Sequence, residues 1–131
     1  MSKEMIIEFG PGKTVSAASD GFTIVTDLPD SLGGDGSAPT PMNLFMASLA
    51  TCAAHFARNF CESRSISMDG MGMKVEYTAD PETKQLTKFN YQLTLPEGFP
   101  EKYKAALLRA VDMCPIKKQL LTPPSFNLEI V

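Results

Sequence analysis

The residues best suited to chemistry in this sequence are three cysteines, Cys52, Cys61 and Cys114, and a single histidine, His55. No CxxC motif, paired carboxylate motif or glycine-rich phosphate loop accompanies them. Their spacing matches no zinc-site pattern, so we expect no metal and no bound cofactor. In a reducing compartment, an odd number of cysteines is more typical of buried or reactive thiols than of structural disulfides. Thiol chemistry is therefore the first hypothesis.

Cys52 lies in the middle of an apolar stretch that predicts a helix. His55 follows three residues later on the same helical face, close enough for an imidazolium to favour the thiolate form of the cysteine. The alternative for Cys52 is a small buried hydrophobic side chain, and the alternative for His55 is a polar side chain on the helix flank. The residues alone leave these interpretations open.

Cys114 directly precedes Pro115 at a junction between two predicted helices. A thiolate at a helix start meets unpaired backbone N–H groups and the positive end of the helix dipole, which lower its pKa. A buried cysteine that caps the preceding helix is the alternative. Cys61 is nine positions after Cys52 and so projects half a turn away from it on a helix. We expect Cys61 to take no part in the chemistry.

The element that must position Cys52 is a helix predicted over 41–63. Thr40 and Pro41 are typical of a helix start, because a hydroxyl caps the first turn and proline needs no hydrogen-bond acceptor there. Apolar residues continue almost all round its first three turns, and polar residues gather only towards its end. At 1.5 Å per residue such a helix is about 34 Å long. This length indicates a central helix that is shared with a partner subunit.

Short segments rich in β-branched and aromatic residues, separated by turn residues, predict strands before and after this helix in the sequence. The apolar positions of the second strand pair alternate, so one face of that hairpin should cover the helices. Residues 28–40 are rich in Pro, Gly, Ser and Asp and predict a long irregular loop over a site. We expect one α+β domain spanning residues 1–131, in the order βββ-α-ββ-αα-β. The predicted elements are strands 5–9, 14–18 and 21–27, helix 41–63, strands 70–80 and 84–95, a helix from Pro100 to Cys114, a short helix after Pro115, and strand 126–131.

Composition excludes several classes of protein. The chain has twelve Lys and Arg and fifteen Asp and Glu, for a net charge of −3. No basic field suited to nucleic acid is therefore present. The N-terminal apolar patch is too short for a signal peptide, and no apolar run approaches the roughly 18 residues that span a bilayer. We therefore expect a cytoplasmic protein with neither nucleic acid nor membrane as a partner.

Three segments together resemble the OsmC/Ohr family, named for osmotically inducible protein C and organic hydroperoxide resistance protein. The first is similar to the family's Pro-x-x-Leu…Ala-Ser-Leu-x-x-Cys helix, and the third to its Cys-Pro helix start. The resemblance covers nearly the whole chain. It implies an intertwined homodimer in which two antiparallel sheets wrap around long central helices, with two sites at the dimer interface. The segments are PMNLFMASLATCAAHFAR (41–58), MDGMGMKVEY (68–77) and DMCPIKKQLLTPP (112–124).

The resemblance also implies roles for the cysteines. Cys52 corresponds to the peroxidatic thiol, which attacks the O–O bond of an organic hydroperoxide or hydrogen peroxide and becomes a sulfenic acid. Cys114 corresponds to the resolving thiol, which forms a disulfide with it. A dithiol reductant, such as a lipoylated protein, then restores both thiols. The implied activity is that of a cysteine-based peroxidase in the oxidative stress response.

The sequence departs from the family pattern beside the first cysteine. The hydroperoxide reductases carry a Glu ten residues before it, paired with an N-terminal Arg, whereas Met42 stands here and no Arg precedes Arg58. Without a nearby cation, burial would raise the pKa of Cys52. His55 or Lys13 is the expected substitute. The alternatives are other thiol or electrophile chemistry, with Met42 shaping an apolar pocket, and a non-catalytic small-molecule-binding dimer.

Overall fold

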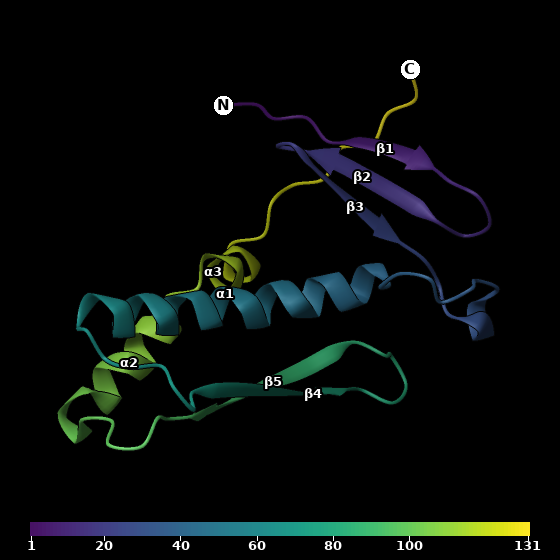
Figure 1. The fold of residues 1–131 in the computed structure, drawn as a ribbon. Coiled ribbons are helices and arrows are strands. Elements are labelled where there is room, and N and C mark those ends of the chain that lie inside the picture. The colour runs from purple at the N-terminus through teal and green to yellow at the C-terminus, as the bar shows by residue number, and fades with distance from the viewer. The chain divides into compact units, whose positions relative to one another are not determined.

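The computed structural model describes residues 1–131, and they divide into two compact units, Met1–Ala47 and Ser48–Val131. Each unit is described by itself. The first holds a three-stranded sheet and the start of the long helix, and the second holds a hairpin, the rest of the long helix, two shorter α-helices and a 3₁₀ helix (Figure 1). The α+β class with two antiparallel sheets is as predicted, while the single domain over 1–131 stays a prediction.

The sheet of the first unit is an antiparallel meander, β1 (Ile6–Phe9), β2 (Val15–Ser19) and β3 (Phe22–Thr26). These bounds agree with the predicted strands to within about one residue. Asp20 and Gly21 connect β2 to β3, both with positive φ, of 51° and 80°. Positive φ at both central residues is the geometry of the two-residue turn that matches the twist of paired strands. The Asp-Gly pair therefore fixes the register of this hairpin.

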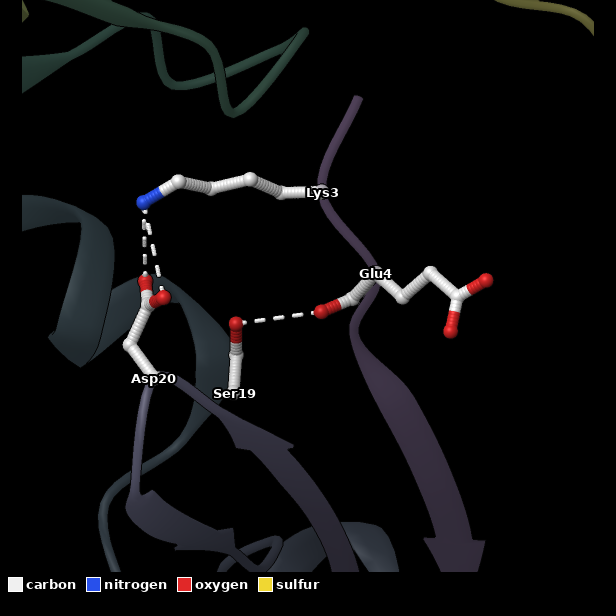
Figure 2. Close-up of polar contacts among 4 residues, drawn as sticks. All are labelled: Lys3, Glu4, Ser19 and Asp20. Carbon is white, nitrogen blue, oxygen red and sulfur yellow. Dashed lines mark hydrogen bonds and ion pairs between the residues drawn. The ribbon is translucent and has the colours of Figure 1, made fainter. Parts of the chain in front are cut away.

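Polar contacts continue the pairing of β1 with β2 beyond the strand ends (Figure 2). The Ser19 hydroxyl donates a hydrogen bond of 3.1 Å to the backbone oxygen of Glu4, and the Lys3 ammonium lies 3.4 Å from the Asp20 carboxylate. Both groups of the ion pair are mostly exposed, so the pair itself adds little stability. The contacts hold the N-terminal segment alongside the turn.

A buried carboxylate organises the loop that the sequence predicted over 28–40. The Asp27 carboxylate accepts hydrogen bonds from the backbone N–H of Leu28 (2.7 Å) and from the N–H (3.0 Å) and hydroxyl (2.6 Å) of Ser37. These bonds, those from Ser37 foremost, lower the pKa of Asp27 to about 2. One short 3₁₀ helix, η1 (Asp30–Leu32), lies inside the loop. The carboxylate thus closes an otherwise irregular segment.

Helix α1 (Pro41–Ser63) has the predicted bounds. The Thr40 hydroxyl accepts the N–H of Asn43 at 3.1 Å, and the Asn43 side-chain oxygen accepts the N–H of Thr40 at 3.1 Å. This reciprocal arrangement satisfies two backbone donors at the helix start. The helix start is therefore fixed by local chemistry, as the Thr40-Pro41 pair indicated.

In the second unit, α1 lies along the hairpin of β4 (Gly72–Ala79) and β5 (Leu86–Thr94) (Figure 1). The chain then forms η2 (Glu101–Tyr103), α2 (Lys104–Val111) and α3 (Pro115–Leu121). Small α1 residues let the other elements approach closely, and the predicted apolar hairpin face packs on this core through Met71, Met73, Tyr91, Leu93 and Leu95. The buried core consists of Ala53, Ala57, Phe60, Cys61, Leu107 and Val111.

Two expectations turn out differently. Tyr77, placed on the apolar face of the hairpin, is half-exposed and contacts the Phe89 ring at 6.4 Å between centroids. The strand predicted over 126–131 is not formed, and its apolar side chains Phe126, Leu128 and Ile130 are almost fully exposed. A strand exists only when its backbone groups pair with a neighbour, and no strand of this chain pairs with these residues.

None of the helices combines the length and the apolar character needed to cross a bilayer.

Candidate active site

The structure brings Cys52 and Cys114 into contact within the second unit. Cys52 is half-buried on α1, and Cys114 is buried at the residue that precedes α3. The two thiols lie close enough for Cys114 to influence the pKa of Cys52, and neither cysteine is part of a disulfide. Two residues from distant parts of the sequence therefore form one reduced thiol pair.

The corner between α2 and α3 places Cys114 at this position. Cys114 has an extended conformation (φ −48°, ψ 119°), as expected of a residue before proline, and Pro115 begins α3. The carbonyl of Cys114 accepts the N–H of Lys118 at 3.1 Å, which closes the first turn of α3. The N–H of Ile116 has no acceptor within this first turn and donates instead to the Cys52 sulfur.

Burial sets the acidity of the Cys52 thiol. Loss of solvent is the largest effect and raises the pKa of Cys52, and the hydrogen bond with Cys114 raises it further. The N–H of Ile116 acts in the opposite direction, because it stabilises the thiolate. The net shift is upward, as the sequence predicted for a buried Cys52 without a nearby cation. At neutral pH Cys52 is therefore held mainly in the thiol form.

A cavity of about 180 Å³, here called the thiol cavity, opens beside Cys114. Lys117 is ion-paired with Asp112 at its rim. Burial and the nearby thiols Cys114 and Cys52 raise the pKa of Tyr91, while Lys117 opposes this shift. A small apolar chamber thus combines a thiol, a phenol and an ammonium group. The lining residues are Ala53, Tyr91, Leu108, Val111, Asp112, Cys114 and Lys117.

His55 is exposed and lines a different cavity, of about 300 Å³, which we call the methionine cavity. Met68, Met71 and Met73 form much of its wall, and Arg58 lies at its edge. Although this cavity is larger, it contains no thiol. Neither His55 nor Arg58 is among the groups that shift the pKa of Cys52.

Cys61 is fully buried in the core, where burial raises its pKa. Its position on the core side of α1 agrees with the expectation that it projects away from Cys52.

Lys13 and Met42 belong to the first unit. The Lys13 side chain lies beside Gly33, where a Cβ would meet its Cε at 3.5 Å, and Met42 is exposed on the first turn of α1. The roles expected of both residues at the thiol stay predictions.

The sequence reasoning missed three residues of this site, Tyr91, Ile116 and Lys117. Tyr91 could have been suspected from its place on the apolar face of β5, which faces the helices. Lys117 comes three residues after Cys114, one turn along the predicted helix. The Ile116 side chain carries no signal, because its contribution comes from the backbone.

No group of three His, Cys, Asp or Glu side chains is placed to hold a metal ion. The polar groups of the thiol cavity are a thiol, a phenol and an ion pair. Groups of these types are suited to proton transfer and to sulfur redox chemistry.

These features define a small α+β protein with a paired-thiol site. The model of the OsmC-like protein family matches residues 34–129, which include both cysteines of the pair. The chain belongs to this family. No protein among the curated ones matches the sequence.

Several solved structures share the fold. One, from Psychrobacter arcticus 273-4, is named for osmotic stress induction and the detoxification response; it is 20% identical with a TM-score of 0.74, covering 91% of this chain and 88% of that one. An OsmC-like protein of Mycoplasma pneumoniae is 18% identical with a TM-score of 0.70, covering 94% and 89%. An organic hydroperoxide resistance protein OsmC of Legionella pneumophila is 24% identical with a TM-score of 0.54, covering 92% and 89%.

Proposed function

We propose that this protein is a thiol-dependent peroxidase that reduces organic hydroperoxides or hydrogen peroxide. The observation that carries the proposal is the proximity of the reduced thiols of Cys52 and Cys114, which is close enough for one to shift the pKa of the other. A disulfide requires its two Cα atoms within about 7 Å, which contact between the thiols favours. Membership of the OsmC-like family and the hydroperoxide resistance named for the Legionella relative also support this function.

In the proposed cycle, the Cys52 thiolate attacks the terminal oxygen of the peroxide and becomes a sulfenic acid, while the peroxide leaves as an alcohol or water. The Cys114 thiol then attacks the sulfenic sulfur and expels water, which gives the Cys52–Cys114 disulfide. A dithiol donor, for which a lipoylated protein is our proposal, reduces this bond by thiol–disulfide exchange. This cycle belongs in a reducing compartment, and we place it in the cytoplasm.

We also propose that the working form is an intertwined homodimer. The sheet of the first unit presents exposed Ile7, Phe9, Phe22 and Ile24, and the unit buries no hydrophobic side chain. The unpaired segment 126–131 carries alternating apolar side chains in the same exposed state. A second copy of the chain could cover the sheet and pair with this segment, which supports the assembly.

The test is stopped-flow oxidation of the reduced protein by cumene hydroperoxide and by hydrogen peroxide, with mass spectrometry of the products. The wild type should form the Cys52–Cys114 disulfide, Cys114→Ser should stop at the sulfenic acid, and Cys52→Ser should lose the reaction. Cys61→Ala is the matched control and should react within about twofold of the wild type, since the Cys61 thiol lies in the core. Oxidation of the wild type no faster than that of a free thiol would refute the peroxidase proposal.

The pH profile sharpens this test. Because burial raises the pKa of Cys52, the reactive thiolate is a minor form at pH 7 and grows as the pH rises towards that pKa. The second-order rate constant with peroxide should therefore increase from pH 7 into the alkaline range. A rate constant that is flat from pH 6 to pH 9 would mean that an unrecognised cation activates Cys52.

One observation favours a second function. The raised pKa of Cys52, with Met42 in place of the family's Glu, suits a less reactive thiol that handles electrophiles or thiol adducts. Rapid adduct formation at Cys52 with an electrophile such as N-ethylmaleimide, combined with slow reaction with peroxides, would favour this alternative. Slow reaction with both would favour a non-catalytic small-molecule-binding dimer.

A further inference from the structure

Tyr91 is the one hydroxyl-bearing side chain that lines the thiol cavity. It lies on β5, paired with Val75 of β4, and its half-buried ring packs against the core of the second unit. The ring is therefore held by the sheet and by the core. Its phenol group shares the cavity with Cys114 and Lys117.

The proposed reaction needs a proton donor at this position. Attack of a thiolate on a hydroperoxide breaks the O–O bond and leaves an alkoxide, which is a strong base. Water has a pKa of about 15.7 whereas a phenol has about 10, so transfer of a phenolic proton to an alkoxide or hydroxide is strongly favourable. In a small cavity with apolar walls, few groups can supply that proton.

The other polar groups near the cavity are less suited to this role. Asp112 and Lys117 are ion-paired with each other, and Cys114 is needed as a thiol in the next step. His55 lines the methionine cavity instead. Tyr91 remains as the donor.

We propose that Tyr91 is the general acid that protonates the leaving oxygen of the peroxide, an inference that rests on the proposed peroxidase function. The Cys52 sulfur forms a bond to the terminal oxygen and is oxidised to the sulfenic acid. The O–O bond breaks, and its electron pair goes to the leaving oxygen. That oxygen takes the phenolic proton and departs as an alcohol, and the phenolate recovers a proton from solvent.

The electrostatics of the cavity fit this role. Burial and the two thiols raise the pKa of Tyr91, so the phenol is fully protonated at neutral pH and ready to donate. Lys117 acts in the opposite direction, because its ammonium stabilises the transient phenolate. The ion pair with Asp112 would thus hold the Lys117 ammonium near the site where the phenolate forms.

The experiment compares three reagents on the intact 131-residue chain. Tyr91→Phe keeps the ring and removes only the hydroxyl, and Tyr77→Phe makes the same change at the half-exposed tyrosine of β4. Oxidation of Cys52 is measured by stopped flow with tert-butyl hydroperoxide, which leaves an alkoxide, and with peracetic acid, which leaves the weakly basic acetate. Alkylation of Cys52 by iodoacetamide, followed by mass spectrometry, reports the reactivity of the thiol itself.

Tyr91→Phe should slow the reaction with tert-butyl hydroperoxide about 100-fold, the usual contribution of general acid catalysis. Its reactions with peracetic acid and iodoacetamide should stay within about threefold of wild type, and Tyr77→Phe should match wild type with all three. Equal slowing with every reagent, or no slowing with tert-butyl hydroperoxide, would overturn the assignment. Failure of the proposed function itself is seen separately, as slow hydroperoxide reduction by the wild-type protein.

Discussion

The two units of the chain are stabilised in different ways. In the second unit, small side chains of α1 pack with Phe60, Leu107 and Val111 into a closed core, and the thiol pair lies beside it. In the first unit the fully buried residues are Asp27 and Gly34, and the order comes from strand pairing and from hydrogen bonds to one carboxylate. The unit that holds the thiol pair is thus the unit that has its own core.

The difference also shows what the first unit lacks. The register of its strands puts Ile7, Ala17 and Ile24 in one row across the sheet, on the same face as Phe9 and Phe22. Sheets of this size need a hydrophobic face packed against something to be stable. In the proposed dimer, a second copy would cover this apolar face, whereas the thiol pair depends on packing within its own unit.

The largest expected effect on stability comes from the core of the second unit. Leu107 is 1% exposed, so Leu107→Ala should lower the free energy of unfolding by about 3 kcal/mol through lost burial and a new cavity. Its neighbour Leu108 is 61% exposed, and Leu108→Ala should cost less than about 0.5 kcal/mol. Urea unfolding followed by circular dichroism measures both. Equal costs would mean that this core does not stabilise the second unit.

A smaller effect is expected from the apolar face of the first unit. Ile24→Lys places a charge in the middle of that face and should weaken self-association at least tenfold, about 1.4 kcal/mol. Thr23→Lys makes the matched change on the opposite face of the same strand and should change the dissociation constant less than threefold. Sedimentation equilibrium gives both constants. A wild-type chain that is monomeric at high micromolar concentration would contradict the proposed dimer.

The smallest expected effect is a loss of stability that occurs only at acidic pH. Because the folded-state pKa of Asp27 is about 2, below the ordinary value of 3.8, its contribution to stability is complete above about pH 4 and is lost as the pH falls towards 2. The protection factor of the Ser37 amide, its exchange relative to an unstructured peptide at the same pH, should fall across this window in the wild type. Asp27→Asn should show low protection at every pH, and Asp30→Asn, changed inside the same loop, should behave as the wild type. Unchanged amide protection of the wild-type loop at pH 2 would mean that the Asp27 carboxylate does not hold the loop in place.

Much of the fold could be predicted because its signals are local. Thr40 and Pro41 marked the start of α1, and the Asp20-Gly21 pair marked a hairpin turn, since each depends on neighbouring residues alone. The segment 126–131 shows the limit of such signals. Its alternating apolar residues are suited to a strand. A strand also needs a neighbouring strand to pair with, and the alternation does not identify that neighbour.

The candidate site, like the fold, could be predicted only where its signals are local. The residues alone left Cys52 and Cys114 as two separate candidates, and the resemblance to a family suggested that they act together. Their contact depends on how the α2–α3 corner turns, which no short motif specifies. Tyr91 reaches the site because of the register of β5, and the N–H of Ile116 reaches it because of the direction of the backbone. The register and the backbone direction both depend on packing across the whole unit.

The burial of Cys61 has a consequence for stoichiometry. With this thiol enclosed in the core, the proposed cycle would use two of the three sulfur atoms of a native chain and would store two electrons per turnover. The odd sulfur cannot exchange with the pair or link one chain to another while the core is intact. Repeated turns of the proposed cycle would therefore return the same single disulfide, and a third thiol should become titratable only when the chain unfolds.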